Sequence, residues 1–154
     1  MKMLSRGRAG LTLPEVLLAT VIIMIAILGI VGLFPTALQN VQYGGHMSQA
    51  SSLAQAMIER MRTESFDTVS SYDGLDTRNG PPGGLPTSVL NHFNEWNTGI
   101  APANPVGALP QGWGTIAVST VAGLPDLLQV TVTVGWQERG NQTISLVTYV
   151  ARYG

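Results

Sequence analysis

Residues 14–38 read PEVLLATVIIMIAILGIVGLFPTAL, and this stretch decides the fold. From residue 16 to residue 34 the only polar side chain is that of Thr20. The hydrocarbon core of a bilayer is about 30 Å thick, and a helix needs about 20 apolar residues to cross it. We therefore expect residues 11–38 to form a transmembrane helix.

One acidic residue, Glu15, stands at the start of this apolar stretch. A charge so close to bilayer hydrocarbon is costly unless it is paired. No other formally charged residue lies between Glu15 and Glu59, so the same helix supplies no partner. A positive α-amino group would lie beside Glu15 if the chain were cut after Gly10. The alternative is a protonated carboxyl group, or a side chain that extends to the lipid headgroups.

The charges are few and unevenly distributed. Charged residues make up 11% of the chain, against roughly 25% in soluble domains. Three of the eight basic residues precede Gly10, and by the positive-inside rule they keep this end in the cytoplasm. The remaining five, against nine acidic residues, do not form a nucleic-acid-binding footprint. The absence of cysteine excludes disulfides and thiolate metal sites.

Two ordinary explanations of the apolar stretch remain open. A secretory signal peptide has an apolar core of about 7–15 residues and ends at a small-residue cleavage site. Here the stretch is longer, and Thr36-Ala37-Leu38 is a poor site of that kind. A plain signal anchor explains every feature except Gly10 and Glu15.

Residues 8–19, RAGLTLPEVLLA, resemble the leader and N-methylation motif of type IV pilins and type II secretion pseudopilins. The resemblance implies that a prepilin peptidase cuts between Gly10 and Leu11, discards residues 1–10 and methylates the new N-terminus at Leu11. It also implies a single-pass protein of the bacterial inner membrane that later enters a surface filament. Leu11 replaces the commoner Phe. Pro14 is tolerated because a first-turn N–H has no acceptor within the helix.

The same resemblance gives Glu15 a function in assembly. In a helical filament the Glu15 carboxylate of one subunit would neutralise the N-terminal amine of its neighbour. Removing one partner of a buried ion pair costs about 3–5 kcal/mol, so the contact would select the correct register. Gly29, Gly32 and Pro35 weaken the outer half of the helix, which we expect to kink or melt there, as in related filament proteins. A Gly-lined packing face with an ordinary kink is the alternative.

The helical pattern resumes after Pro35 and makes residues 39–65 an amphipathic continuation of the same helix. Gly44-Gly45 is a second weak point in it. The apolar face consists of Met47, Ala50, Leu53, Ala54, Met57, Ile58 and Met61. We interpret this stripe as core.

The rest of the chain divides into loops and strands. Residues 66–114 are predicted as Gly- and Pro-rich loops with one short helix near 87–97, capped by Thr87 or Ser88. Residues 115–154 contain three alternating segments, 115–121, 128–136 and 143–151, with a tight turn at 138–141. The predicted fold is α+β: one long N-terminal helix packed against an antiparallel meander of three to four strands, as in pilins.

Three further segments resemble the minor pilins of the type IV pilus modification group. They are a helix containing Trp96, the turn LPQGWG at 109–114 and the strand VTVTVGW at 130–136, in this order. Residues 54–62, AQAMIERMR, resemble the helix end of that group and of minor type II pseudopilins. The missing cysteine pair departs from many major pilins and favours a minor subunit.

Neither histidine, His46 nor His92, has another His, Cys or carboxylate at the spacing of metal ligands. His92 and Glu95 are spaced to meet on one helix face, but we interpret them as part of a solvated polar face. The sequence shows no Ser-His-Asp order, no Gly-rich phosphate loop after a strand and no pair of carboxylates that would form a catalytic cleft. We expect neither catalysis nor a cofactor.

Asp67, Asp73 and Asp76 lie close together in the sequence, with a glycine between the last two. Their spacing lacks the EF-hand pattern and its closing Glu. We therefore do not predict a calcium site in this loop.

The sequence thus predicts a structural minor pilin that enters a type IV pilus at or near its tip, or primes its assembly. Its expected partners are other pilins or pseudopilins, the prepilin peptidase and the inner-membrane assembly platform. One alternative is a minor pseudopilin of a type II secretion system or a competence pilus. Another is a membrane-anchored binding module whose β domain acts as an adhesin, although no cluster of aromatic and basic residues supports a specific ligand.

Overall fold

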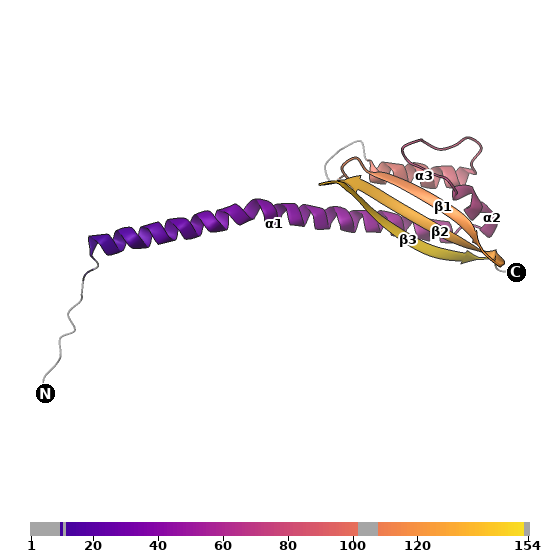
Figure 1. The fold of residues 1–154 in the computed structure, drawn as a ribbon. Coiled ribbons are helices and arrows are strands. Elements are labelled where there is room, and N and C mark those ends of the chain that lie inside the picture. The colour runs from indigo at the N-terminus through magenta and orange to yellow at the C-terminus, as the bar shows by residue number, and fades with distance from the viewer. Residues whose placement is uncertain (1–9, 11, 102–107, 153–154) are drawn as a thin grey trace, which may run out of the picture. The chain divides into compact units, whose positions relative to one another are not determined.

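The long N-terminal helix is the first element of the computed structural model, which describes residues 10, 12–101 and 108–152. Helix α1 (Leu13–Arg62) runs without interruption and appears as one coiled ribbon in Figure 1. The chain falls into two units, Met1–Gln42 and Tyr43–Gly154, and α1 contributes to both. The fold is α+β, as predicted: the long helix packs, through its C-terminal turns, against a three-stranded antiparallel sheet.

The sheet of the second unit is a simple meander in the order β1-β2-β3. Its strands are β1 (Trp113–Val121), β2 (Leu124–Gln137) and β3 (Asn141–Ala151). They include the three predicted segments and extend each of them by a few residues. The alternating apolar side chains of β2 are buried on one face, as the pattern of period two requires. These side chains are those of Leu128, Val130, Val132, Val134 and Trp136.

Three short helical elements connect α1 to the sheet: α2 (Phe66–Val69), the 3₁₀ helix η1 (Ser70–Tyr72) and α3 (Thr87–Ile100). The first two lie where only loop was predicted. Ser65 starts α2 because its hydroxyl accepts a hydrogen bond from the Thr68 amide. Val69 and Tyr72 then become buried, and this burial stabilises two turns that are too short to be recognised by periodicity.

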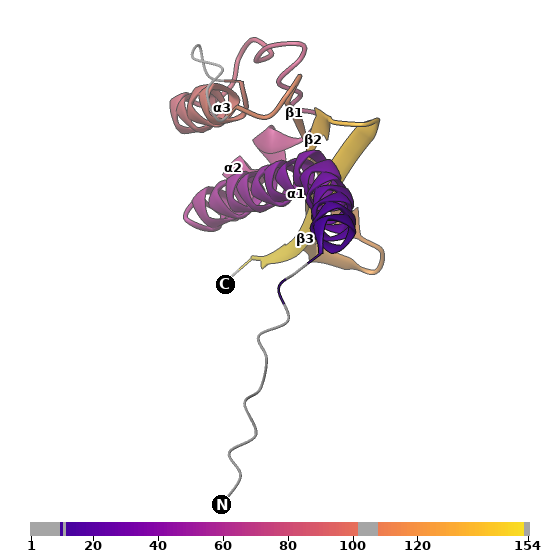
Figure 2. The ribbon, with the colours of Figure 1, turned by 90° about the vertical axis from the view of Figure 1, so that its left-hand side faces the viewer.

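Helix α3 differs from its prediction at both ends. Pro86, not Thr87 or Ser88, occupies the N-cap position, and no side chain caps this end. The Pro86 carbonyl accepts a hydrogen bond from the Leu90 amide instead. The helix continues to Ile100, whose side chain is fully buried, so burial extends it beyond the predicted end. Figure 2 shows α3 beside β1, at the opposite end of the strand order from β3.

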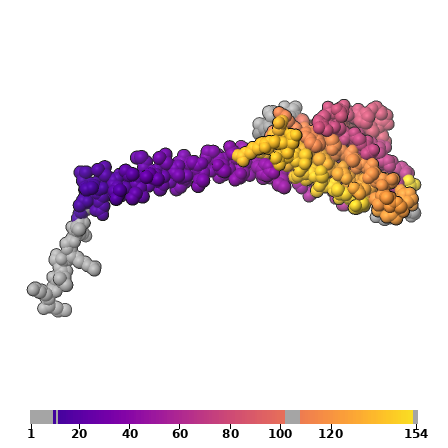
Figure 3. Space-filling model, in the orientation of Figure 1, coloured from indigo at the N-terminus to yellow at the C-terminus, as the bar shows by residue number. Residues whose placement is uncertain are grey.

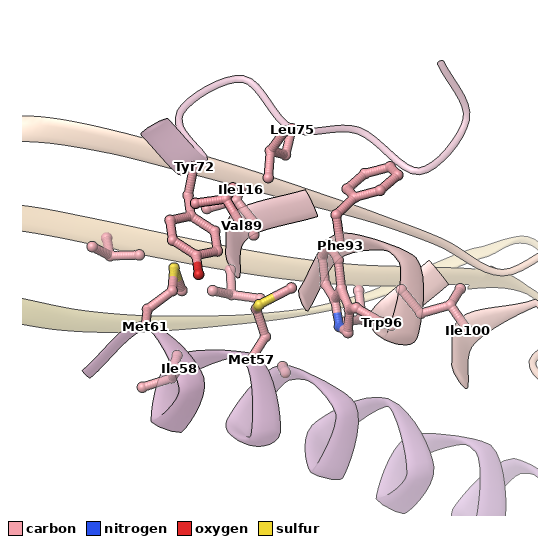
Figure 4. Packing of buried hydrophobic residues seen from close by; sticks show 14 of the residues in the cluster. Met57, Ile58, Met61, Tyr72, Leu75, Val89, Phe93, Trp96, Ile100 and Ile116 are labelled. Carbon is pink, nitrogen blue, oxygen red and sulfur yellow. The ribbon is translucent and has the colours of Figure 1, made fainter. Parts of the chain in front are cut away.

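The core of the second unit lies between the sheet, α3 and the last turns of α1. Figure 4 shows Met57 and Met61 of α1 facing Phe93 and Tyr72. Burial of each large apolar side chain stabilises the fold by roughly 1.5–3 kcal/mol. Five members of the predicted stripe are buried, Leu53 is partly buried, and Met47 is about half exposed.

Two tryptophans lie directly against glycines of the sheet. A Cβ atom on Gly114 would come within 2.4 Å of the Trp96 ring, and one on Gly135 within 2.3 Å of the Trp113 ring. The Arg78 guanidinium lies 4.5 Å from the centroid of Trp113. These glycines are therefore needed for ring packing and not for backbone freedom, since neither has positive φ.

Candidate functional site

Helix α1 starts at Leu13, with Thr12 at its N-terminal boundary. The Thr12 carbonyl accepts hydrogen bonds from the amides of Glu15 and Val16, at 3.0 and 3.2 Å. In return, the Thr12 amide donates a long hydrogen bond of 3.5 Å to Glu15 Oε2. This contact is one half of a capping box. The pattern Thr-x-x-Glu is its sequence signature, so the contact could have been predicted from residues 12–15.

The Glu15 carboxylate is exposed to solvent on the first turn of α1. Within residues 10, 12–101 and 108–152, no basic group forms an ion pair with it. Gly10 is also exposed, and a Cβ atom there would meet nothing. Leu11 lies outside the described residues. The carboxylate is therefore open to a partner from outside the described chain.

The apolar stretch that follows is uncovered along its whole length. Every residue from 16 to 34 is exposed, including the large side chains Val16 at 47% and Leu33 at 68%. At 1.5 Å per residue these 19 positions span about 28 Å, close to the thickness of a hydrocarbon core. α1 is the one helix in the described part of the chain that is long and apolar enough to cross a membrane. The first unit is thus compatible with a single-pass membrane anchor.

Gly29, Gly32 and Pro35 all lie inside the continuous helix α1. The single chain therefore has no melted segment between Leu13 and Arg62, and melting in a filament stays a prediction. A Cβ atom on Gly29 or Gly32 would meet nothing within 4 Å. Packing within the described chain therefore does not require either glycine.

The two histidines both contact carboxylates in the second unit. His46 Nδ1 lies 2.8 Å from Glu138 Oε2, which also accepts a hydrogen bond from the Trp136 indole at 3.3 Å. The hydrogen bond from His46 lowers the pKa of the Glu138 carboxyl below its usual value. Tyr43 donates to Gln142 Oε1 at 3.2 Å nearby. These contacts link α1 to the β2–β3 turn.

His92 does not pair with Glu95, although their spacing on α3 would allow it. Its Nδ1 lies 2.6 Å from the Tyr72 hydroxyl and 3.9 Å from Glu64, while Glu95 pairs with Arg60 at 2.7 Å. Burial, and secondarily the negative charge of Glu64, raises the pKa of Tyr72. The phenol is therefore neutral at physiological pH, and its ring belongs to the buried core.

The three loop aspartates have different partners. Asp67 pairs with Arg152 at 2.7 Å, and Asp73 Oδ1 accepts a hydrogen bond from the Val118 amide at 2.8 Å. Asp76 binds Arg78, whose hydrogen bonds hold the pKa of the Asp76 carboxyl below its usual value. Among the described residues, no three His, Asp or Glu side chains are grouped as metal ligands.

No family model, curated protein or solved structure matches this chain. The functional interpretation therefore depends on the residues at the start of α1 and on the chemistry of its exposed surface.

Proposed function

We propose that this chain is a minor pilin. It is made with a leader of residues 1–10, cut between Gly10 and Leu11 by a prepilin peptidase, methylated at Leu11, and built into a type IV pilus. One observation carries the proposal: an apolar helix surface, residues 16–34, that is exposed along its whole length and begins directly after Glu15. Such a surface requires lipid before assembly and apolar neighbours after it.

The position of Glu15 supports a function in assembly. Its side chain lies on the first turn of α1, and in the sequence it is four residues after Leu11, whose amine cleavage after Gly10 would create. Inside a filament of packed apolar helices this carboxylate would lose its water, and an unpaired buried charge is strongly destabilising. The N-terminal amine of an adjoining subunit supplies the missing positive charge. The pair therefore forms only when subunits dock in the correct register.

A simpler function for Glu15 is that it only caps its own helix. The hydrogen bond from the Thr12 amide is the evidence for this function. Glutamine also serves at this position of a capping box, because its amide oxygen accepts the same hydrogen bond. Glutamine cannot neutralise an amine, however. The substitution Glu15→Gln therefore separates the cap from the ion pair, whereas Glu15→Val removes both.

The experiment compares wild type, Glu15→Gln and Glu15→Val in cells that assemble the filament. We expect all three proteins to be cleaved and to remain in the membrane. Both variants should be depleted at least tenfold from sheared filaments. If Glu15→Gln were incorporated at the wild-type level, Glu15 would act only as a helix cap. If Glu15→Val were also incorporated at the wild-type level, Glu15 would have no function in assembly.

A further inference from the structure

The two edges of the sheet differ sharply. The outer edge of β1 is occupied from Gly114 to Val118 by residues 73–77, and the Val118 amide donates to Asp73 Oδ1. The amides of Gly74 and Thr77 donate to the carbonyls of Ile116 and Gly114, and the Ile116 amide donates to Leu75. The Gly114 amide donates to the Thr77 hydroxyl. This edge is therefore covered from Gly114 to Val118.

The outer edge of β3 has no such cover. Among the described residues, the backbone of β3 forms hydrogen bonds with β2 alone. In β1 the even-numbered residues direct their N–H and C=O groups away from β2, so the odd-numbered residues bond to β2. Along an antiparallel strand the backbone groups of successive residues bond alternately to the neighbour on one side and on the other. The register therefore pairs even-numbered residues of β2 with even-numbered residues of β3, and the odd-numbered residues of β3 direct their groups away from β2. They are the N–H and C=O groups of Thr143, Ser145, Val147 and Tyr149. In Figure 3 the yellow atoms of β3 form a continuous band on the visible surface.

Edge strands normally carry features that prevent pairing with other chains: charges, prolines, bulges or short length. Strand β3 has none of these. Its 11 residues, NQTISLVTYVA, include no charge, proline or glycine. Its register against β2 is constant from Leu127 opposite Ala151 to Gln137 opposite Asn141. Val147 and Tyr149 beside the open edge are 52% and 57% exposed.

The surroundings of this edge indicate the chemistry of its partner. A row of alternating donors and acceptors at strand spacing is complementary to an extended peptide backbone. The lack of charge along β3 favours an uncharged partner strand. At the C-terminal end of β3 lies a hollow of about 350 Å³, lined by Arg62, Tyr149, Val150 and Ala151. Arg62 is the one charge in this lining. One of its nitrogens donates to the Thr148 hydroxyl at 3.0 Å, which holds the guanidinium beside β3, and its exposed pair with Glu59 is weak, so the hollow suits an acidic side chain.

We propose that β3 binds an extended segment of a neighbouring filament subunit as a fourth strand. The segment is uncharged opposite Thr143–Tyr149 and carries an acidic side chain where it passes Arg62. This inference rests on the proposed function, because it takes the partner from the same filament. Docking by strand addition supplies directional backbone hydrogen bonds that helix packing alone does not.

The first test is residue-resolved amide hydrogen exchange on the full chain, in detergent and in isolated filaments. In detergent the even-numbered amides of β3 should be protected and those of residues 143, 145, 147 and 149 should exchange freely. In filaments the odd-numbered amides should slow at least tenfold. A chain absent from filaments would contradict the proposed function, whereas an incorporated chain with unchanged odd-numbered amides would contradict strand addition alone.

The second test uses a matched pair of variants. Val147→Pro removes an N–H that points away from β2, so the β2 ladder is retained. Val147→Thr keeps that N–H and the branched side chain. We expect Val147→Pro to lower incorporation at least fivefold with an unchanged circular dichroism spectrum, and Val147→Thr to behave as wild type. Equal incorporation of the two folded variants would overturn the proposal. It would also be overturned if the chain formed a homodimer in detergent in which the odd-numbered amides of β3 were protected from exchange, because a second copy would then be the occupant.

Discussion

His46 Nδ1 lies 2.8 Å from Glu138 Oε2, although the two residues are 92 positions apart in the chain. Their side chains are only 22% and 18% exposed. Gly44 and Gly45, each unfavourable in a helix by about 1 kcal/mol, precede His46 in α1. Tyr43, on the other side of these glycines, bonds Gln142. The β2–β3 hairpin thus contacts α1 on both sides of the Gly44-Gly45 pair.

We predict that Glu138→Gln destabilises the second unit by about 1 kcal/mol, because a charge-assisted hydrogen bond is replaced by a neutral one. Amides of residues 44–47 should exchange faster in the same variant. Arg139→Gln, in the same turn and exposed, is the matched control and should change stability by less than about 0.5 kcal/mol. Thermal unfolding of the detergent-solubilised chain measures both. An equal effect of the two substitutions would contradict this function of the hairpin.

The lowered pKa values of Asp76 and Glu138 predict how the free energy of unfolding falls in acid. A carboxyl whose folded pKa is depressed contributes stability above its unfolded pKa, near about 4, and loses it as pH falls through the folded value. The melting temperature should therefore be flat above about pH 5.5 and fall below about pH 4. The double variant Asp76→Asn, Glu138→Gln should show a shallower fall. If the melting temperature of the double variant fell with pH as steeply as that of the wild type, Asp76 and Glu138 would not be the groups responsible for the loss of stability in acid.

Gly114→Ala should destabilise the second unit by about 1–3 kcal/mol, since its methyl group would overlap the Trp96 ring. Gly83→Ala is the control, because a Cβ atom there meets open space and the residue has no positive φ. Chemical denaturation followed by tryptophan fluorescence reports both changes. Similar midpoints for the two variants would show that Trp96 does not require the glycine.

The double substitution Gly29→Ala, Gly32→Ala should leave cleavage and membrane insertion unchanged, because both sites are open. Each alanine stabilises the helix by about 1 kcal/mol, so melting during assembly becomes harder. We expect incorporation into filaments to fall severalfold. Gly44→Ala, Gly45→Ala stiffens the helix elsewhere and should assemble normally. Normal assembly of the first double variant would exclude a requirement for melting at this segment.

Local patterns predicted much of the fold. The apolar stretch after Glu15 gave the long helix, and the period-two alternation from Leu128 to Trp136 gave the central strand. The Thr12-x-x-Glu15 cap was also readable from the sequence, because both partners lie within one helical turn.

The sequence could not predict contacts made between distant segments. The pairing of His46 with Glu138 and of Tyr72 with His92 depends on how α1, α3 and the sheet meet. The closure of the β1 edge by residues 73–77 uses mainly backbone groups, which leave no side-chain signature. The open edge of β3 becomes apparent only once that closure is known.

The most direct test of the account is the mass of the N-terminal peptide of the protein extracted from membranes or filaments. The account predicts a peptide that begins at Leu11 and carries one N-methyl group. A chain that begins at Met1 would leave Glu15 without the neighbouring amine, and a chain that begins beyond Phe34 would lack Glu15 altogether. Either result would contradict the proposed function.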